Sequence, residues 1–121
     1  EIFEHEKEIL SPISLIFESI INSETVFNKS NEIVIDGDLL KFPLKLRKKE
    51  QGDYFYPFGM RGKKKVSKHF KDEKFSMFDK QETWLLVNNN EEIIWIVGSR
   101  MDDRFKINNQ TNYKLKIKLV K

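Results

Sequence analysis

The chain has 121 residues and a mass of 14.5 kDa, enough for one domain with a buried core. It contains no cysteine, which excludes a disulfide framework, a thiolate nucleophile and cysteine-ligated zinc or iron–sulfur sites. The formal net charge is only +3, but residues 41–74 hold twelve Lys and Arg against four Asp and Glu, whereas residues 1–40 carry a net charge of −7. A local positive field of this kind attracts a polyanion, and salt weakens the attraction.

The pattern of hydrophobic residues predicts a protein outside the membrane. No apolar run approaches the eighteen or so residues of a membrane span. The first eight residues are acidic, where a signal peptide would be basic. We therefore expect a cytoplasmic protein without a membrane partner. Because the chain begins at Glu1 and not at methionine, we also expect a piece of a longer protein.

The first element along the chain has the signature of a helix. Ser11-Pro12 is typical of a helix start, and the apolar residues that follow recur at helical spacing. These residues are Ile13, Ile16, Phe17, Ile20 and Ile21. The spacing predicts an amphipathic helix that ends near Asn22, followed by a strand over 32–36 and a turn at Gly37-Asp38.

Basic residues are interleaved with apolar ones in the middle of the chain. From Pro43, alternation predicts a strand with Leu44 and Leu46 inward and Lys45 and Arg47 outward. Residues 63–73 are expected to be helical. The helix would hold Lys64, Lys68 and Lys71 on one face and would be anchored by Val66 and Phe70 on the other.

The last third of the chain is rich in β-formers. Two apolar runs, 84–87 and 93–97, enclose the turn formers 88–91 and predict a buried hairpin. In residues 113–119, apolar residues alternate with Lys114, Lys116 and Lys118, which predicts a strand with one core face and one basic face.

Residues 52–65 combine glycines, a proline, aromatic residues and cations. Gly52, Gly59 and Gly62 permit positive φ angles and Pro57 stiffens the segment, so its backbone N–H groups and the lysines at 63–65 could converge on an anionic group. The segment is not a Walker A loop, because the glycine spacing is too short and no Ser or Thr follows a Gly-Lys pair. The alternative is an ordinary solvated surface, since lysine outnumbers arginine 18 to 4.

No catalytic and no metal site is predicted. His5 and His69 are isolated, and a partly buried structural role suits His69 better than general-base catalysis. The pair Asp102-Asp103 beside Arg104 is typical of turn and salt-bridge contacts. The aromatic residues at 54, 55, 56 and 58 could stack on bases, but alternation around Pro57 places at least half of them in the core.

An ordered set of motifs carries a family resemblance. It comprises Leu46-Arg47, Gly52-Asp53, Pro57-Phe58-Gly59-Met60, Gly62, Lys64-Lys65-Val66-Ser67, Phe70-Lys71-Asp72-Glu73-Lys74, Ile94-Trp95-Ile96-Val97-Gly98, Arg100, Arg104-Phe105-Lys106 and Thr111. In this order the motifs resemble the C-terminal domain of tRNA(Ile)-lysidine synthase, over about residues 40–120. The chain departs from many members at Phe75-Ser76, where an aliphatic residue and proline are usual, and at Lys80, where arginine is common.

The resemblance implies a fold and a parent activity. The fold is α+β, a small layered β-sandwich also present in phenylalanyl-tRNA synthetase, here with the N-terminal helix and connecting strand in residues 1–39 and the tRNA-binding domain in residues 40–121. The parent would be a bacterial ligase that uses ATP and Mg to join lysine to the wobble cytidine of tRNA(Ile). The Ser-Gly-Gly-x-Asp-Ser loop of the family's N-terminal catalytic domain does not occur in this sequence, so we expect no cofactor in this chain.

The resemblance and the charge pattern together select candidate residues for binding tRNA(Ile), by analogy at its acceptor stem. They are Arg47, Arg61, Lys63, Lys64, Lys65, Lys68, Lys71 and Arg100, with Gly52, Pro57, Gly59 and Gly62 shaping the loop. The arginines suit geometry-demanding contacts, either to phosphate or to internal carboxylates such as Asp103. The rest of the parent chain is a further expected partner, and a homodimer is left open. Two rival hypotheses are a protein–protein or dimerisation module with a generic basic surface, and a small independent enzyme.

Overall fold

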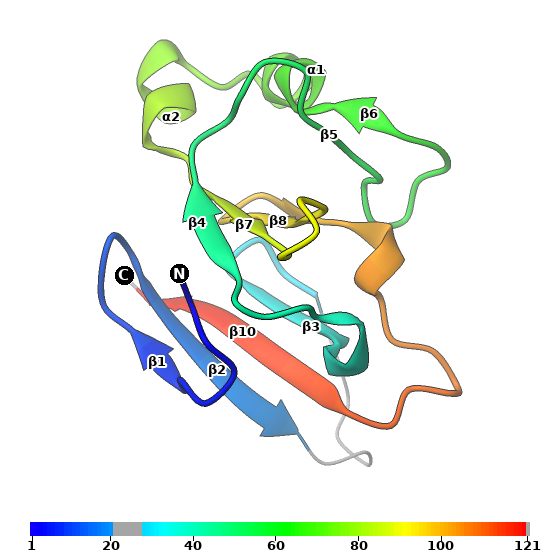
Figure 1. The fold of residues 1–121 in the computed structure, drawn as a ribbon. Helices are drawn as coiled ribbons and strands as arrows, with labels where there is room; N and C mark the ends of the chain where they lie inside the picture. Colours follow the sequence, from blue (N-terminus) through cyan, green and yellow to red (C-terminus); the bar gives the residue numbers. More distant parts are fainter. Residues whose placement is uncertain (21–27, 121) are drawn as a thin grey trace.

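Antiparallel β-strands and two short helices are arranged in three layers (Figure 1). The computed structural model describes residues 1–20 and 28–120. The lower sheet has the strand order β1 (Glu8–Ile9), β2 (Ser14–Ile20), β10 (Lys114–Val120) and β3 (Glu32–Asp36). The central sheet has the order β4 (Lys45–Arg47), β7 (Leu85–Val87), β8 (Ile93–Ile96) and β9 (Arg100–Met101). The helical layer contains the two-stranded pair β5 (Tyr54–Phe55) and β6 (Lys64–Lys65), α1 (Val66–Asp72) and α2 (Met77–Glu82).

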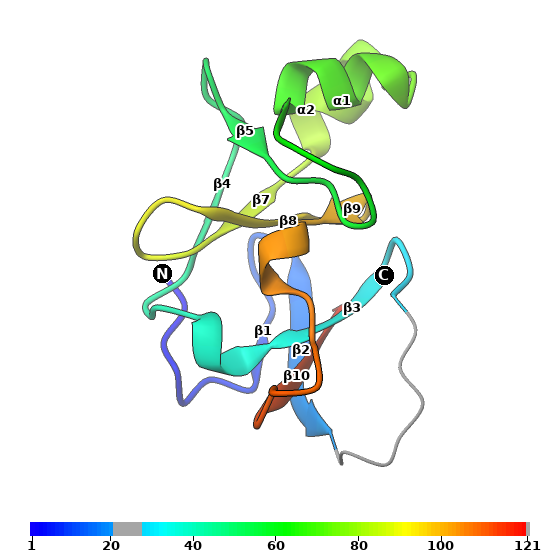
Figure 2. The ribbon, with the colours of Figure 1, turned by 90° about the vertical axis from the view of Figure 1, so that its right-hand side faces the viewer.

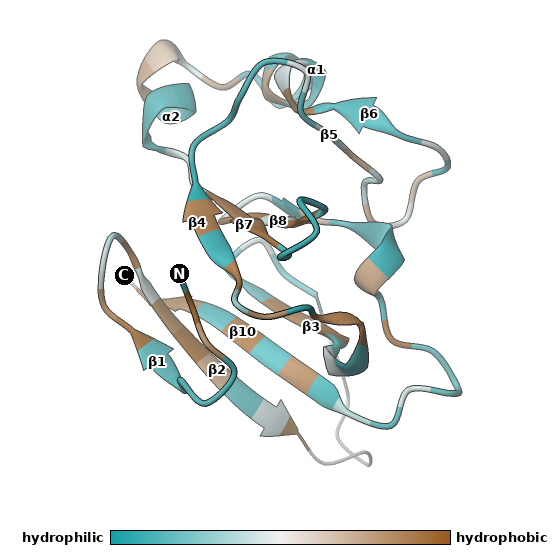
Figure 3. Ribbon diagram, in the orientation of Figure 1, coloured by the Kyte–Doolittle hydropathy of each residue, from teal (hydrophilic) through white to brown (hydrophobic). Residues whose placement is uncertain are grey.

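Strand β10 confirms the predicted alternation at the end of the chain. It pairs with β2 along one edge and with β3 along the other, so it lies in the middle of the lower sheet. Leu115 and Ile117 are buried in the core, and the lysines that alternate with them, at 114, 116 and 118, occupy the opposite face, which Figure 3 shows as alternating bands along β10. The predicted strand at 32–36 is confirmed as β3, and the turn after it is a short 3-10 helix, η1 (Gly37–Leu39).

The predicted N-terminal helix is wrong, because the segment forms strand β2. Residues 13, 15 and 17 are apolar as well, so the segment carries a period-two pattern beside the helical one. Leu15 and Phe17 are buried, and all seven residues of β2 pair with β10. This long-range pairing prevails over local spacing. Ile21 and Asn22, where the helix was expected to end, lie outside the described residues, and the predicted boundary between residues 39 and 40 stays a prediction.

The central sheet is buried on both faces. Leu86, Ile94 and Trp95 pack toward the lower sheet, whereas Leu85, Val87, Ile93 and Ile96 pack toward the helical layer with Phe55, Val66 and Phe70. Leu86 pairs with Trp95 and Val87 with Ile93, so Ile94 is an extra bulged residue. The bulge lets two neighbouring side chains reach the same core. The predicted hairpin at 84–97 is confirmed.

The helical layer covers one face of the central sheet (Figure 2). Val66 and Phe70 anchor α1, as predicted. The helix is shorter than predicted, because Lys64 and Lys65 form β6 and pair with Phe55 and Tyr54. Lys64 therefore lies on a strand beside α1, not on the helix. Among the described residues, no helix is long and apolar enough to cross a membrane.

Candidate nucleic-acid interface

The glycine-rich loop after β5 is held in place by the segment after β9. The backbone N–H of Tyr56 donates to the buried carboxylate of Asp102 at 2.9 Å, and that of Asp103 donates to the carbonyl of Tyr56 at 2.6 Å. The backbone N–H of Gly59 donates to Asp103 Oδ1 at 3.2 Å. Pro57 forms a bridge with Asp102 within this arrangement. These contacts fix one side of the loop, and its other side faces solvent.

Glycine is required in this loop for backbone conformation. Gly59 has φ = +83° and Gly62 has φ = +76°, in the left-handed region that side chains rarely adopt. A Cβ at either position would meet no described atom within 4 Å, so the demand comes from the backbone and not from crowding. Gly52, with φ = +87°, has the same property in the preceding turn. The predicted positive φ angles are confirmed.

A basic depression opens where this loop meets β6 and α1. Its volume is about 390 Å³. It is lined by Pro57, Met60, Arg61, Gly62, Lys63, Lys64, Lys65, Lys68 and Asp72. Five cationic side chains thus surround one carboxylate. Loop, strand and helix each contribute to this cluster, which we call the basic depression.

Asp72 organises two of these cations. Its carboxylate lies 2.7 Å from Lys64 Nζ and 3.3 Å from Lys68 Nζ. The hydrogen bonds from Lys64 and Lys68 lower the pKa of Asp72. Lys64 is held most firmly, since its side chain is only 17% exposed, whereas Lys68 is largely solvated.

The other three cations of the depression come from the loop and from β6. Lys63 lies over the ring of Tyr54, with Nζ 4.7 Å from the centroid. Within residues 1–20 and 28–120, Arg61 and Lys65 make no side-chain ion pair, and both are exposed. Their charges are therefore available to an anionic ligand.

Two arginines selected from the sequence are engaged inside the protein. Arg47 forms a two-point ion pair with Asp53, at 2.8 and 3.0 Å. Arg100 Nη1 donates to the carbonyl of Phe58 at 3.3 Å. Neither arginine lines the basic depression. Lys71 is exposed on α1 but also lies outside the lining set. RNA contacts by these three residues stay predictions.

The expected structural roles of His69 and Asp102 are confirmed. His69 is 2% exposed, its Nε2 lies 2.8 Å from Ser99 Oγ, and burial lowers the pKa of the imidazole. Asp102 is fully buried and binds Arg104 through both carboxylate oxygens, at 3.0 and 2.9 Å. The guanidinium of Arg104 also lies over the ring of Tyr56. Phe55 is buried, whereas Tyr54 is exposed on the surface beside Lys63.

A second group of lysines was missed by the sequence reasoning. Lys48, Lys49 and Lys80 line a depression on the other side of α1. Lys48-Lys49 belongs to the basic stretch of the sequence, but Lys80 lies thirty residues farther along. Only the fold places the three together.

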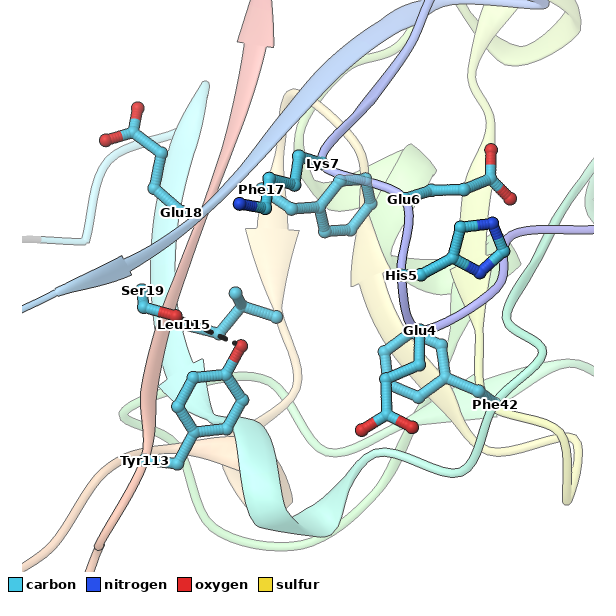
Figure 4. A pocket seen from close by; sticks show the side chains of 10 residues that line it. All are labelled: Glu4, His5, Glu6, Lys7, Phe17, Glu18, Ser19, Phe42, Tyr113 and Leu115. Atoms are coloured by element: carbon cyan, nitrogen blue, oxygen red, sulfur yellow. Dashed lines mark hydrogen bonds between the residues drawn. The ribbon is translucent and has the colours of Figure 1, made fainter.

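An acidic depression lies at the lower sheet, far along the chain from the basic one. It is lined by Glu4, His5, Glu6, Lys7, Phe17, Glu18, Ser19, Phe42, Tyr113 and Leu115 (Figure 4). The three carboxylates in the figure point in different directions and not toward a common point. In the part of the chain that the structure describes, no group of three or more His, Cys, Asp or Glu is placed to hold a metal ion. This geometry gives no support to the hypothesis of an independent enzyme.

Comparisons with known proteins agree with the fold. A crystal structure of a TilS C-terminal domain superimposes with a TM-score of 0.74 and 20% identity, covering 89% of this chain and 85% of that one. An N-terminal fragment of the phenylalanyl-tRNA synthetase beta-subunit from Pyrococcus horikoshii gives a TM-score of 0.58 with 17% identity, over 71% of this chain and 27% of that one. At these identities the likeness shows the fold alone, and it confirms the predicted layered α+β class.

Sequence relatives identify the family. The tRNA(Ile)-lysidine synthase of Parabacteroides distasonis is 45% identical over 102 residues, which are 83% of this chain and 23% of that protein. That of Clostridium acetobutylicum is 32% identical over 117 residues, 95% of this chain and 24% of that protein. The chain thus spans about a quarter of the length of the relatives it matches. A family model described as TilS substrate C-terminal domain matches residues 44–117. The chain therefore belongs to the C-terminal domain family of the tRNA(Ile)-lysidine synthases.

Proposed function

We propose that this domain binds tRNA(Ile), at the acceptor stem, through the basic depression. The observation that carries the proposal is that Arg61, Lys63 and Lys65 line the depression without an ion-pair partner among the described residues, beside Lys64 and Lys68. A duplex RNA presents phosphates and 2′-hydroxyl groups along its backbone, while its base edges are hidden in a deep, narrow major groove. Exposed lysines around a fixed glycine-rich loop suit contact with such a backbone.

Asp72 gives the basic depression a defined shape. By pairing with Lys64 and Lys68 it keeps two ammonium groups at a fixed spacing, which free lysines on a surface would not maintain. Its charge also reduces the total positive field. Binding would therefore combine this pair of cations with Arg61 and Lys63 from the loop and Lys65 from β6.

The parent enzyme would supply the chemistry. We propose that it is a ligase that uses ATP and Mg in a separate catalytic domain to join lysine to the wobble cytidine, in the bacterial cytoplasm. The domain described above would hold the tRNA for the catalytic domain. Its second partner would be the rest of the parent chain.

Replacement of Arg61, Lys63 and Lys65 tests the proposal. The variant Arg61→Ala/Lys63→Ala/Lys65→Ala should bind an acceptor-stem hairpin at least about tenfold more weakly, measured by fluorescence anisotropy at 0.1 M salt. The matched control replaces the exposed Lys29, Lys41 and Lys118, which remove the same charge from other surfaces. Equal affinities of the two variants would refute the proposed site.

The rival hypothesis of a dimerisation surface requires a continuous patch of exposed Phe residues. The described Phe residues with the greatest exposure are Phe3 and Phe78. Phe3 follows Ile2, which forms a bridge with Leu44 before β4, whereas Phe78 lies on α2 in the helical layer. No single patch forms among the described residues, so RNA binding is the better-supported function.

A further inference from the structure

A second depression lies on the other flank of α1. Its volume is about 490 Å³. It is lined by Lys48, Lys49, Ser67, Phe70, Lys80 and Gln81. Among these described residues none is acidic, so three ammonium groups surround the depression without a carboxylate between them. Helix α1 separates the two basic surfaces, because Lys68 lines the first and Ser67 lines the second.

The lining combines charge with an apolar wall. Phe70 stacks on Phe75 with ring centroids 4.7 Å apart, so its ring is fixed where it borders the depression. Ser67 and Gln81 also line the depression, and their side chains carry a hydroxyl and an amide that can form hydrogen bonds. Cations alone fit any polyanion, but this mixture fits a ligand with a flat apolar part, a polar edge and a negative charge.

Lys48 is held in place at the rim. Its Nζ donates to the carbonyl of Gln81 at 2.5 Å and lies 4.2 Å from the ring centroid of Trp84. The contact fastens the segment after β4 to α2. The depression therefore has two fixed walls, although the contact joins residues that are 33 positions apart in the sequence.

Helix α2 exposes apolar side chains next to this depression. Every residue of α2 is exposed, with Met77 at 68% and Phe78 at 69%. Met77 precedes Lys80 and Gln81 by one helical turn and so shares their face. The helix is held by a capping box between Ser76 and Asp79, not by burial of these side chains. Its apolar residues are thus free to contact a ligand.

We propose that the depression between α1 and α2, with Met77, is a binding site for one unpaired nucleotide. The base would lie against Met77 and the edge of Phe70, its polar edge would meet Ser67 and Gln81, and its phosphate would meet Lys49 and Lys80. A base inside a duplex is covered by its neighbours and cannot enter, whereas an unpaired base offers both faces. The inference rests on the proposed RNA-binding function but uses other residues. The unpaired nucleotide could come from a single-stranded RNA end or from a free nucleotide such as AMP.

Paired RNA probes test this site separately from the basic depression. We expect a hairpin with a four-nucleotide 3′ overhang to bind the wild-type domain about fivefold to a hundredfold more tightly than the blunt hairpin, since stacking of one base typically contributes a factor in this range. The variant Met77→Ala/Lys80→Ala should lose this gain. Its affinity for the blunt hairpin should fall by no more than the removal of one positive charge causes. Lys41→Ala/Val120→Ala, which removes one exposed cation and one exposed apolar side chain elsewhere, is the control.

The outcomes distinguish the two proposals. If the wild-type domain binds both hairpins equally, or if the α2 variant keeps the gain, the nucleotide site is refuted while the basic depression stands. If blunt-hairpin binding survives loss of Arg61, Lys63 and Lys65, the proposed function fails instead. Trp84 fluorescence identifies the source, because Trp95 is fully buried. Quenching by AMP that the α2 variant abolishes would support the site with a free nucleotide, and quenching by the overhang alone would support an RNA end.

Discussion

Arg47 and Asp53 form a two-point ion pair that closes the turn between β4 and β5. Arg47 Nη1 lies 2.8 Å from Asp53 Oδ2, and Nη2 lies 3.0 Å from Oδ1. The same carboxylate accepts the backbone N–H of Glu50 at 2.8 Å. The side chains are only 18% and 12% exposed. An arginine in the basic stretch of the sequence thus serves the fold.

Replacing Arg47 should therefore affect stability. Arg47→Ala leaves the carboxylate of Asp53 without its cation in a largely buried position, and we expect the free energy of unfolding to fall by about 1–3 kcal/mol. Urea denaturation at pH 7 measures this change. Arg61→Ala is the control, because that side chain is exposed, and its effect should stay within about 0.5 kcal/mol. Similar losses in the two variants would contradict the role assigned to the pair.

The contribution of this pair should depend on pH. Desolvation alone would raise the pKa of Asp53, but the hydrogen bonds from Arg47 and Glu50 and the nearby positive charges outweigh it, and the pKa lies below its ordinary value. A depressed pKa in the folded state stabilises fully above the unfolded value of about 3.9, and this stabilisation disappears as the pH falls through the lower, folded value. The stability difference between wild type and Arg47→Ala should thus be constant from pH 7 to 5 and shrink below about pH 4. A difference that grew with acid would contradict the ion pair.

Gly59 and Gly62 should resist substitution because of their φ angles. Gly59→Val or Gly62→Val forces a β-branched side chain into the left-handed region, and we expect a loss of about 1–3 kcal/mol of stability together with weaker RNA binding. Met60→Leu between them should change neither by much. Thermal unfolding and anisotropy on the same samples check this prediction. If both valine variants retain the wild-type melting temperature and affinity, the glycines are incidental.

Removing the carboxylate of Asp72 should strengthen RNA binding. Asp72→Asn deletes one negative charge from the basic depression and releases Lys64 and Lys68, so affinity for the acceptor-stem hairpin should rise, by up to about eightfold at 0.1 M salt. Glu18→Gln, which removes one exposed negative charge from β2, is the charge-matched control. An unchanged or lower affinity of the Asp72 variant would mean that the spacing it imposes on the two lysines matters more than its charge.

The domain alone should not carry out the parent's reaction. Its sequence lacks the Ser-Gly-Gly-x-Asp-Ser loop, and among the described residues no acidic or histidine cluster is placed for a metal. Incubation with ATP, lysine and tRNA(Ile) should release no AMP above background. AMP release by the purified chain would overturn this expectation, whereas release only after addition of a catalytic domain would agree with it.

An element could be predicted from the sequence where neighbouring residues determine it, and could not where a distant strand does. The alternation at 113–119, the hairpin at 84–97 and the positive φ angles of the glycines follow from neighbouring residues, and all were predicted. Residues 13–20 contain both a helical and an alternating apolar pattern. The partner strand β10, almost a hundred residues away, decides between them. Lys64 and Lys65 likewise become a strand because Tyr54 and Phe55 pair with them.

In the candidate site, too, the sequence predicted only what depends on residues close together along the chain. The sequence predicted the cluster from Arg61 to Lys68, whose members are close along the chain and meet in one depression. It left open whether arginines contact phosphate or internal groups, and the fold commits Arg47 to Asp53 and Arg100 to a backbone carbonyl. Lys80 joins Lys48 and Lys49 only through the packing of α2, so no sequence pattern could select it.

The salt dependence of acceptor-stem binding tests the central claim most directly. Log K falls with log salt, and each phosphate contact adds nearly one unit to the steepness of this fall, so the wild-type slope should be steeper than that of Arg61→Ala/Lys63→Ala/Lys65→Ala by about 2 to 3 units. The triple variant of Lys29, Lys41 and Lys118 should retain the wild-type slope. Equal slopes for the wild type and the depression variant, with both proteins folded by circular dichroism, would contradict the claim that these three cations meet the RNA backbone.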